Sequence, residues 1–194
     1  AAQGMVAGLN AALQVKKMTP AVFHRSDSYI GVLIDDLITR GVSEPYRMFT
    51  SRAEYRLILR SDNADQRLTE YGRRIGSVSN YRYEVFCKKK EEILKYTQIL
   101  KNKYFSPTAI EKTGLKINKD GVKRSLFQIM SYPKTNRGNI EALYPKYKDV
   151  SENVKVQLEN DARYDSYLKR QRNEIEMLKR DNSYKIPKYF DYSN

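Results

Sequence analysis

The sequence predicts a mainly α-helical fold. Apolar residues recur at the spacing of an amphipathic helix in three long segments, over residues 26–41, 79–103 and 151–181. Proline and glycine residues fall between these segments and indicate where helices end. A share of 40% hydrophobic residues is enough for a buried core. The one segment whose side chains alternate as in a strand is short and lies at residues 55–60.

The composition indicates an anionic partner. The 194 residues include 36 Lys and Arg against 23 Asp and Glu, a net charge of +13, together with 16 tyrosines. The basic excess is concentrated in the middle of the chain. Such a composition favours binding to nucleic acid. No apolar run reaches the ~18 residues that a membrane-spanning helix needs, so we expect no membrane protein.

The chain has one cysteine, Cys87, and one histidine, His24. These counts exclude a disulfide or a Cys-x-x-Cys zinc site within the chain and argue against a His-rich metal site. Cys87 lies in a predicted helix with no histidine nearby, so we expect a buried or incidental thiol rather than a nucleophile. Neither a G-x-G-x-x-G nor a G-x-x-x-x-G-K-[ST] motif occurs, so no self-contained nucleotide phosphate loop is present. We therefore predict no catalytic residue and no metal site.

The chain begins with a predicted helix. Four apolar side chains share one face of it: Met5, Leu9, Ala12 and Leu13. Gly4 and Gly8 leave a groove that suits close packing against another backbone. The segment lacks the basic start and long apolar core of a signal peptide. Because the helix is already under way at Ala1, we expect a longer protein to precede it.

The clearest local pattern predicts a helix over residues 26–41. One of Ser26, Asp27 and Ser28 can cap its start, and Gly41 can end it. Its apolar face contains five residues at helical spacing: Ile30, Leu33, Ile34, Leu37 and Ile38.

Asp35 and Asp36 are neighbouring carboxylates in this helix. Successive residues of a helix point in different directions, so the two side chains do not face one catalytic site. We expect them on a solvated, acidic outer face.

Four arginines follow the chain break at Glu44-Pro45, at intervals of five, four and four residues: Arg47, Arg52, Arg56 and Arg60. Tyrosine and phenylalanine residues lie among them. A planar guanidinium can hold two phosphate oxygens at once, so the cluster indicates nucleic-acid binding. The alternative is a set of structural ion pairs with Glu44, Glu54 and Asp62, and the sequence leaves both open. The alternating residues 55–60 could form a short strand.

The chain beyond Asp62 is predicted to be mainly helical. Ser79 or Asn80 can cap a helix that runs to about Lys103 and presents a solvated, lysine-rich outer face. We expect its inward side chains to be Val85, Phe86, Ile93, Leu94, Thr97, Leu100 and Tyr104. A short helix marked by Val122, Leu126, Ile129 and Met130 is predicted before Pro133, and another, capped by Asn139, before Pro145.

The last long helix is predicted over residues 151–181, with Ile186-Pro187 ending it. Five residues follow a 4-3-4-3 spacing along one seam: Tyr164, Leu168, Gln171, Ile175 and Leu178. A short seam interrupted by a glutamine indicates packing within the molecule rather than a coiled coil.

Several long strings of residues resemble one family. They are AAQGMVAGLNAA at residues 1–12, YIGVLIDDLITRGVSEPYRMFTSRAEYRLILRSDNADQRLTEYGRRIG at 29–76, and RYDSYLKRQRNEIEML with IPKYFDY near the end. They are similar to the FAD-dependent tRNA uridine 5-carboxymethylaminomethyl modification enzymes, the glucose-inhibited division protein A (MnmG/GidA) family. The resemblance implies that residues 1–62 are the end of a Rossmann-type FAD-binding domain and residues 63–194 a truncated helical C-terminal domain.

The resemblance also implies a function. The family acts on the wobble uridine, in the anticodon region of tRNA, with FAD, NADH and a folate one-carbon donor, together with a GTPase partner. It implies a homodimer in the complete enzyme and a cytoplasmic location. By the resemblance, Gln3, next to Gly4, contacts the flavin at a helix N-terminus. The free N–H groups of such an end favour negative charge.

The chain departs from the family pattern in three ways. It lacks the glycine-rich FAD loop, Cys87 matches neither of the family's two catalytic cysteines, and the family continues into a terminal segment associated with the GTPase partner. We therefore expect the chain alone to be inactive. A binding module that holds RNA without chemistry and a non-functional remnant of a split gene are the alternative interpretations.

Overall fold

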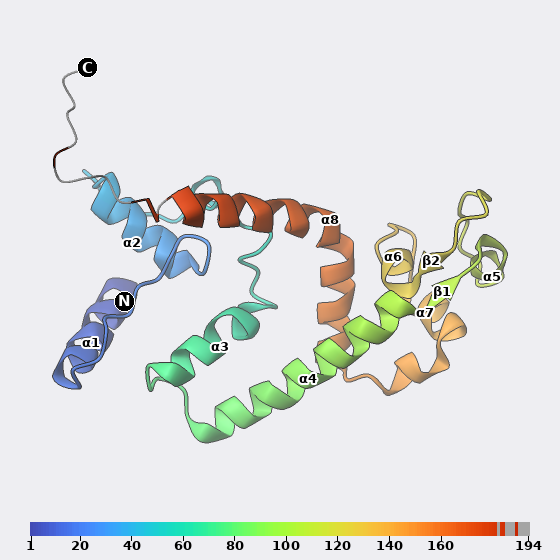
Figure 1. Ribbon diagram of the computed structural model, residues 1–194, viewed down its shortest axis with the longest axis horizontal. Coiled ribbons are helices and arrows are strands. Elements are labelled where there is room, and N and C mark those ends of the chain that lie inside the picture. The colour runs from blue at the N-terminus through green and yellow to red at the C-terminus, as the bar shows by residue number, and fades with distance from the viewer. Residues whose placement is uncertain (182, 185–188, 190–194) are drawn as a thin grey trace, which may run out of the picture.

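Helices make up most of the chain in its computed structural model, which describes residues 1–181, 183, 184 and 189 (Figure 1). The N-terminal part contains α1 (Ala2–Val15), α2 (Tyr29–Thr39), the 3₁₀ turn η1 (Thr50–Arg52) and α3 (Ala64–Arg74). The second part contains α4 (Asn80–Asn102), β1 (Tyr104–Phe105), α5 (Pro107–Glu111), β2 (Arg124–Ser125), α6 (Leu126–Met130), α7 (Arg137–Leu143), η2 (Pro145–Asp149) and α8 (Glu152–Asp181). The prediction of a mainly α fold is confirmed.

Two long helices extend between the ends of the molecule. α1 and α2 lie at one end, and α5, α6, α7 and the β1–β2 pair lie at the other (Figure 1). α4 contacts α3 near one end and α6 and α8 near the other. α8 begins beside α4, changes direction partway along its length and continues toward α2. The second part of the chain therefore returns to the first through α8.

α2 begins and ends where the sequence predicts. The Ser28 side chain accepts a hydrogen bond from the Gly31 backbone N–H at 3.0 Å, and Gly41 has a positive φ of 65° just after the helix. Gly31 is needed where the preceding loop crosses the first turn, because a Cβ there would lie 2.1 Å from the His24 carbonyl oxygen. This close crossing brings Arg25 beside α2.

The buried face of α2 differs from the predicted one. Val32 and Asp36 are buried, whereas Ile38 is 75% exposed and the rest of the predicted apolar face is half-buried. The expectation that Asp36 lies on a solvated outer face is wrong, because its carboxylate is 1% exposed. Buried charges require partners, and Asp36 has three, which are described below.

Residues 55–60 form turns rather than the short strand that their alternation suggests. The backbone N–H groups of Ile58 and Leu59 both donate to the Tyr55 carbonyl, at 2.8 and 3.0 Å. The Asn63 side chain donates to the Ile58 carbonyl at 2.9 Å. These local bonds occupy the groups that a strand would offer to a neighbour, so the strand prediction is wrong.

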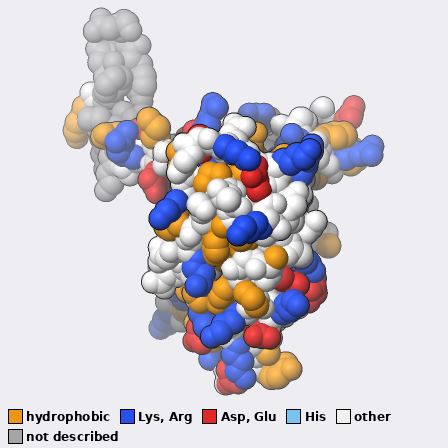
Figure 2. Space-filling model, turned by 90° about the vertical axis from the view of Figure 1, so that its right-hand side faces the viewer, with side chains coloured by type: hydrophobic (Ala, Val, Ile, Leu, Met, Phe, Trp, Pro, Cys, Tyr) orange, Lys and Arg blue, Asp and Glu red, His pale blue; other side chains and the backbone are white. Residues whose placement is uncertain are grey.

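The main hydrophobic core lies in the second part of the molecule, where α4, α5, α6, α7, η2 and α8 meet. Its most buried members include Leu100, Ile110, Leu126, Ile129, Tyr147 and Leu158. The antiparallel β1–β2 pair, with Tyr104 opposite Ser125, closes the loop that contains α5. Figure 2 faces this end of the molecule and shows apolar side chains among many Lys and Arg side chains.

α4 starts after its predicted cap, since the Ser79 side chain accepts from the Arg82 backbone N–H. Phe86, Ile93 and Leu100 are buried as predicted. The prediction is wrong for three other residues, which are more than half exposed: Val85, Leu94 and Tyr104. α4 contacts α3, α6 and α8, and its three buried residues, spaced seven apart, form one narrow apolar stripe along it.

The short helices follow their predicted positions with two differences. α6 ends before Pro133, but Val122 lies outside it and is 56% exposed. α7 is capped by Asn136 rather than Asn139. The Asn136 side chain accepts from the Asn139 N–H at 3.0 Å, while the Asn139 side chain accepts from the Asn136 N–H at 2.8 Å. This reciprocal capping box explains why the helix starts before Asn139.

α8 packs along its predicted seam. Leu168 and Ile175 are buried, and the Gln171 side-chain amide donates to the Glu54 carbonyl at 3.1 Å. The interpretation as a packing face within the molecule is confirmed here, whereas Leu178 is 43% exposed. The predicted helix end at Ile186-Pro187 lies outside the described residues. None of the helices in the described part of the chain is long and apolar enough to cross a membrane.

Candidate nucleic-acid interface

The site begins with a buried carboxylate on α2. Asp36 accepts from Arg25 at 2.5 Å, from the Tyr46 hydroxyl at 2.7 Å and from Arg52 at 3.3 Å. The donors come from the loop before α2, from the segment after it and from η1. Asp36 therefore ties three separate segments to one point.

The guanidinium of Arg25 is engaged in hydrogen bonds within the protein. Its guanidinium also donates to Asp35 at 3.0 Å, to both oxygens of Glu54 at 3.0 and 3.1 Å, and to the Arg52 carbonyl at 2.9 Å. Its side chain is 17% exposed. Because Arg25 donates both to Asp36 of α2 and to the Arg52 carbonyl of η1, it holds these two elements together.

The contacts around Asp36 determine the protonation states of Asp36 and Tyr46. Burial alone would raise the pKa of Asp36, but hydrogen bonds from Arg25 and Tyr46 outweigh burial and hold that pKa below its ordinary value. Burial and the hydrogen bond to Asp36 together raise the pKa of the Tyr46 phenol. Asp36 thus stays ionised and Tyr46 stays protonated at neutral pH.

A basic cleft opens beside this cluster. The arginine cleft, as we name it, has a volume of about 500 Å³ and is lined by Arg25, Arg40, Phe49, Ser51, Arg52 and Glu54. Arg52 stacks over Tyr46 with its guanidinium carbon 4.9 Å from the ring centroid and is 33% exposed. Arg47 stacks on Phe49 at 5.3 Å. The cleft combines planar cations with aromatic rings, which is the chemistry that binds phosphates and bases.

Arg40 is a member of this cleft that the sequence analysis missed. It is the C-cap residue of α2 and is exposed. No ion pair within the described residues includes Arg40, Arg47 or Arg56. Arg40 lies seven residues before Arg47, so a longer window on the arginine spacing would have included it.

Arg60 lies in a different environment from the other predicted arginines. It donates to Asp62 at 3.0 Å and to Asp161 of α8 at 2.6 Å, and it stacks on the Tyr164 ring at 5.6 Å. Its side chain is only 11% exposed. The structure thus places Arg52 in the lining of the arginine cleft and stacks Arg47 on Phe49 of that lining. It leaves Arg56 exposed nearby in sequence and places Arg60 in a junction with α8.

The predicted flavin-contacting residues lie at the start of α1. Gln3 and Gly4 are exposed. Ala1, the N-cap, makes no side-chain capping hydrogen bond, so the first N–H groups of α1 are available to a ligand. Apart from the neighbouring residues and backbone of α1 itself, no described atom lies within 4 Å of the position that a Cβ on Gly4 or Gly8 would take. This open helix end has the donors and the room that a flavin would need, and no backbone packs into the predicted glycine groove among the described residues.

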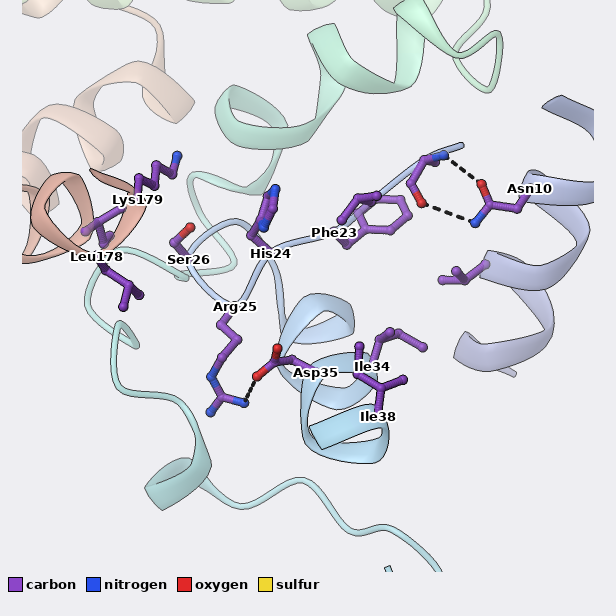
Figure 3. A pocket seen from close by; sticks show the side chains of 14 residues that line it. Asn10, Phe23, His24, Arg25, Ser26, Ile34, Asp35, Ile38, Leu178 and Lys179 are labelled. Atoms are coloured by element: carbon purple, nitrogen blue, oxygen red, sulfur yellow. Dashed lines mark hydrogen bonds and ion pairs between the residues drawn. The ribbon is translucent and has the colours of Figure 1, made fainter. Parts of the chain in front are cut away.

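A second cavity is lined by residues of α1, of the loop before α2, of α2 and of α8 (Figure 3). It has a volume of about 350 Å³, and its walls include Phe23, His24, Ile34, Ile38 and Ile175. The Asn10 side chain fixes one side of it, accepting from the Ala21 N–H at 2.6 Å and donating to the Ala21 carbonyl at 3.2 Å. More than half of the residues that line it are apolar, and its charged residues include Arg25 and Asp35, which pair with each other, and Lys179.

The described residues contain no group of three or more His, Cys, Asp or Glu placed to hold a metal ion. Cys87 is a free, half-buried thiol on α4.

Comparisons with known proteins identify the family. A sequence profile described as the tRNA modifying enzyme MnmG/GidA C-terminal helical domain matches residues 80–172. The chain is 45% identical over 199 residues to the tRNA uridine 5-carboxymethylaminomethyl modification enzyme MnmG of Caldicellulosiruptor saccharolyticus, covering 100% of the chain and 31% of that protein. It is 42% identical over 194 residues to the MnmG of a Nitratiruptor species, covering 98% of the chain and 31% of the relative.

A solved structure agrees with the sequence comparisons. The structure of Aquifex aeolicus GidA in the form II crystal matches with a TM-score of 0.78 and 36% identity, covering 100% of this chain and 30% of that one. The chain spans about 31% of the length of the two MnmG relatives named above. With the helical domain, the long sequence matches and the matching structure in agreement, the chain belongs to the MnmG/GidA family of tRNA modifying enzymes and contains its C-terminal helical domain.

Proposed function

We propose that this chain is the tRNA-binding part of an FAD-dependent enzyme that, with a GTPase partner, installs the 5-carboxymethylaminomethyl group on the wobble uridine of tRNA. The arginine cleft is the observation that carries this proposal. The chain alone is not catalytic, because it has neither a nucleotide phosphate loop nor the catalytic cysteines of the family pattern. The relatives that share its sequence are named for this uridine modification.

Residues 1–62 would form the end of the Rossmann-type FAD-binding domain, and residues 63–194 the helical domain. Gln3 and Gly4 would hold the flavin, because Gln3 can both donate and accept hydrogen bonds and the α1 N-terminus offers free N–H groups. FAD would supply the redox chemistry, with NADH as reductant and a folate one-carbon donor. The complete enzyme would be a cytoplasmic homodimer.

Arg40, Arg47, Arg52 and Arg56 would bind phosphates that flank the target uridine. Arg52 is the most constrained of them, since Asp36 and Tyr46 hold its guanidinium at the edge of the cleft. A guanidinium held in this way loses less conformational entropy when it binds a phosphate. Arg60, in contrast, would maintain the junction with α8.

The direct test is binding of the 194-residue chain to a fluorescein-labelled tRNA anticodon stem-loop. We expect affinity to fall steeply with salt, because each neutralised phosphate releases counterions. R40A and R56A should each weaken binding about threefold to tenfold and leave the melting temperature unchanged, since each such phosphate contact is worth about 1 kcal/mol. R60A is the matched control and should lower the melting temperature while the remaining folded protein keeps its affinity.

A flat response to salt, or arginine variants that lose stability but not affinity, would overturn the RNA-binding role of the cleft. Activity requires a longer context. In a chimera that carries this chain in place of the matching third of the Caldicellulosiruptor saccharolyticus enzyme, we expect wobble-uridine modification, and we expect R40A to reduce it.

A further inference from the structure

We propose a second RNA-backbone contact at the opposite end of the molecule from the arginine cleft. The site is a cleft of about 350 Å³ between the loop after α5 and the segment after α6, lined by Lys116, Asn118, Arg124, Tyr132, Pro133 and Lys134 among others. We name it the distal cleft. This inference rests on the proposed function, because its ligand is the phosphodiester backbone of the same tRNA.

The charge of this end of the chain supports an anionic partner. Residues 101–150 contain 11 Lys and Arg against 4 Asp and Glu, so they supply +7 of the net charge of +13. Figure 2 faces this end and shows Lys and Arg side chains spread over its surface. Two of the four carboxylates are already engaged. Glu111 pairs with Lys119 at 3.1 Å, and Asp120 pairs with Arg124 at 2.6 Å.

Two lysines of the distal cleft are available to a ligand. Lys116 and Lys134 are exposed and lie on the two segments that line it. Neither takes part in an ion pair within the part of the chain that the structure describes, and no Asp or Glu is among the residues that line the cleft. A phosphate between the two segments would therefore meet cations without a competing carboxylate.

Tyr132 adds a hydroxyl donor to the lining of the distal cleft. Its phenolic oxygen accepts from Arg124 Nε at 2.7 Å, so its own O–H proton is left to donate. Asp120 fixes the other side of Arg124, with contacts of 2.6 and 3.0 Å. Hydrogen bonds from Arg124 and from the Val122 backbone hold the pKa of Asp120 at about 2, so this pair stays ionised at any physiological pH.

Both walls of the distal cleft are anchored by buried or hydrogen-bonded residues. The Tyr132 ring packs against the main core, and Leu115 in the opposite wall is 4% exposed. The turn after α6 is tied by the Thr135 hydroxyl, which donates to the Ile129 carbonyl at 2.7 Å. The Tyr132 donor is thus positioned before any ligand arrives, which lowers the entropy cost of binding.

A polymer fits these features better than a free phosphate. The two ammonium groups of the distal cleft are exposed to solvent, so one small anion would gain little from them. Five further lysines of residues 101–150 are exposed: Lys101, Lys103, Lys112, Lys123 and Lys146. A nucleic-acid backbone with repeated charges can contact several cations at once. Because α2 and the distal elements lie at opposite ends of the molecule (Figure 1), the distal cleft would contact a part of the tRNA beyond the anticodon stem-loop.

The test compares charge-matched variants of the 194-residue chain. K116Q/K134Q removes the two cleft lysines, and K88Q/K95Q removes two exposed lysines of α4 as the control. With labelled whole tRNA we expect K116Q/K134Q to weaken binding about tenfold and to reduce the log–log salt slope by about two, while the control loses less than about threefold. Y132F should weaken binding about threefold with an unchanged melting temperature.

Two further arms identify the ligand. With the isolated anticodon stem-loop, K116Q/K134Q should bind like the control, whereas R40A should still lose affinity. Sodium phosphate at 10 mM should displace whole tRNA no more than potassium chloride of equal ionic strength. Equal losses in K116Q/K134Q and in the control, an equal loss with the stem-loop, or displacement by phosphate alone would each overturn the proposal. Loss of stem-loop binding in R40A together with any of these results would leave the proposed function intact.

Discussion

Asp36 is the residue on which the geometry of the arginine cleft depends. Its buried carboxylate is stable only because Arg25, Tyr46 and Arg52 all donate to it. The same contacts hold Arg52 beside the Tyr46 ring at the edge of the cleft. A residue that never touches RNA in our proposal thus positions one that does.

D36N should lower the free energy of unfolding by about 3 kcal/mol, because it leaves Arg25 and Arg52 without their shared anion in a desolvated place. Asp35 is the matched control: it is the preceding residue, is 38% exposed and, among the described residues, forms an ion pair with Arg25 alone. D35N should cost less than about 1 kcal/mol. Urea denaturation of both variants measures the difference, and equal losses would contradict the central role of Asp36.

The same carboxylate gives the stability a pH dependence of known sign. The folded-state pKa of Asp36 is below its unfolded value, so its contribution is complete above the unfolded pKa of about 3.9 and is lost as the pH falls toward the folded pKa. The gap in unfolding free energy between wild type and D36N should therefore be largest above about pH 5 and shrink below about pH 4. Denaturant titrations at neutral and acidic pH test this, and a gap that widens in acid would refute it.

Removing the Arg60 side chain should destabilise the protein more than removing that of Arg56. R60A leaves Asp62 and Asp161 facing each other without a cation and removes a contact with the Tyr164 ring. We expect a loss of about 2–3 kcal/mol of unfolding free energy, whereas R56A should cost less than about 0.5 kcal/mol. Chemical denaturation of the two variants compares them directly. A stable R60A protein would show that the junction does not depend on this pair.

At the scale of helices, the burial of a side chain along α8 determines how much it contributes to stability. Leu158 is fully buried in the main core, whereas Leu178 near the other end of the same helix is 43% exposed. L158A should cost about 3 kcal/mol, and L178A less than about 1 kcal/mol. Thermal melts of the two variants test this, and similar losses would mean that the end of α8 packs more tightly than its exposure indicates.

The sequence predicted helix positions better than helix faces. The starts of α2 and α4 follow from local capping serines, and these interactions span only three residues. The buried face of α2 could not be predicted because the partners of Asp36 come from loops 10 to 16 residues away. The role of Arg60 depends on Asp161, 101 residues later. Local patterns carry no information about contacts at that separation.

At the scale of the whole molecule, cofactor retention is a property that the chain should lack. Gln3 and Gly4 at the open N-terminus of α1 are the flavin contacts that we propose, and the sequence contains no phosphate loop. We expect FAD to separate from the 194-residue chain on gel filtration, with no absorbance near 450 nm in the protein peak. A yellow protein peak with one flavin per chain would show that this part binds FAD by itself.

The change of direction in α8 also determines the order in which the protein can complete its fold on the ribosome. Arg60 and Glu54 are synthesised well before α8, yet each has a partner on that helix, Asp161 and Gln171, which lie 101 and 117 residues later. Contacts of such long separation form slowly, and domains otherwise tend to fold in the order of synthesis. The contacts between the first part of the chain and α8 can therefore form only after α8 has left the exit tunnel.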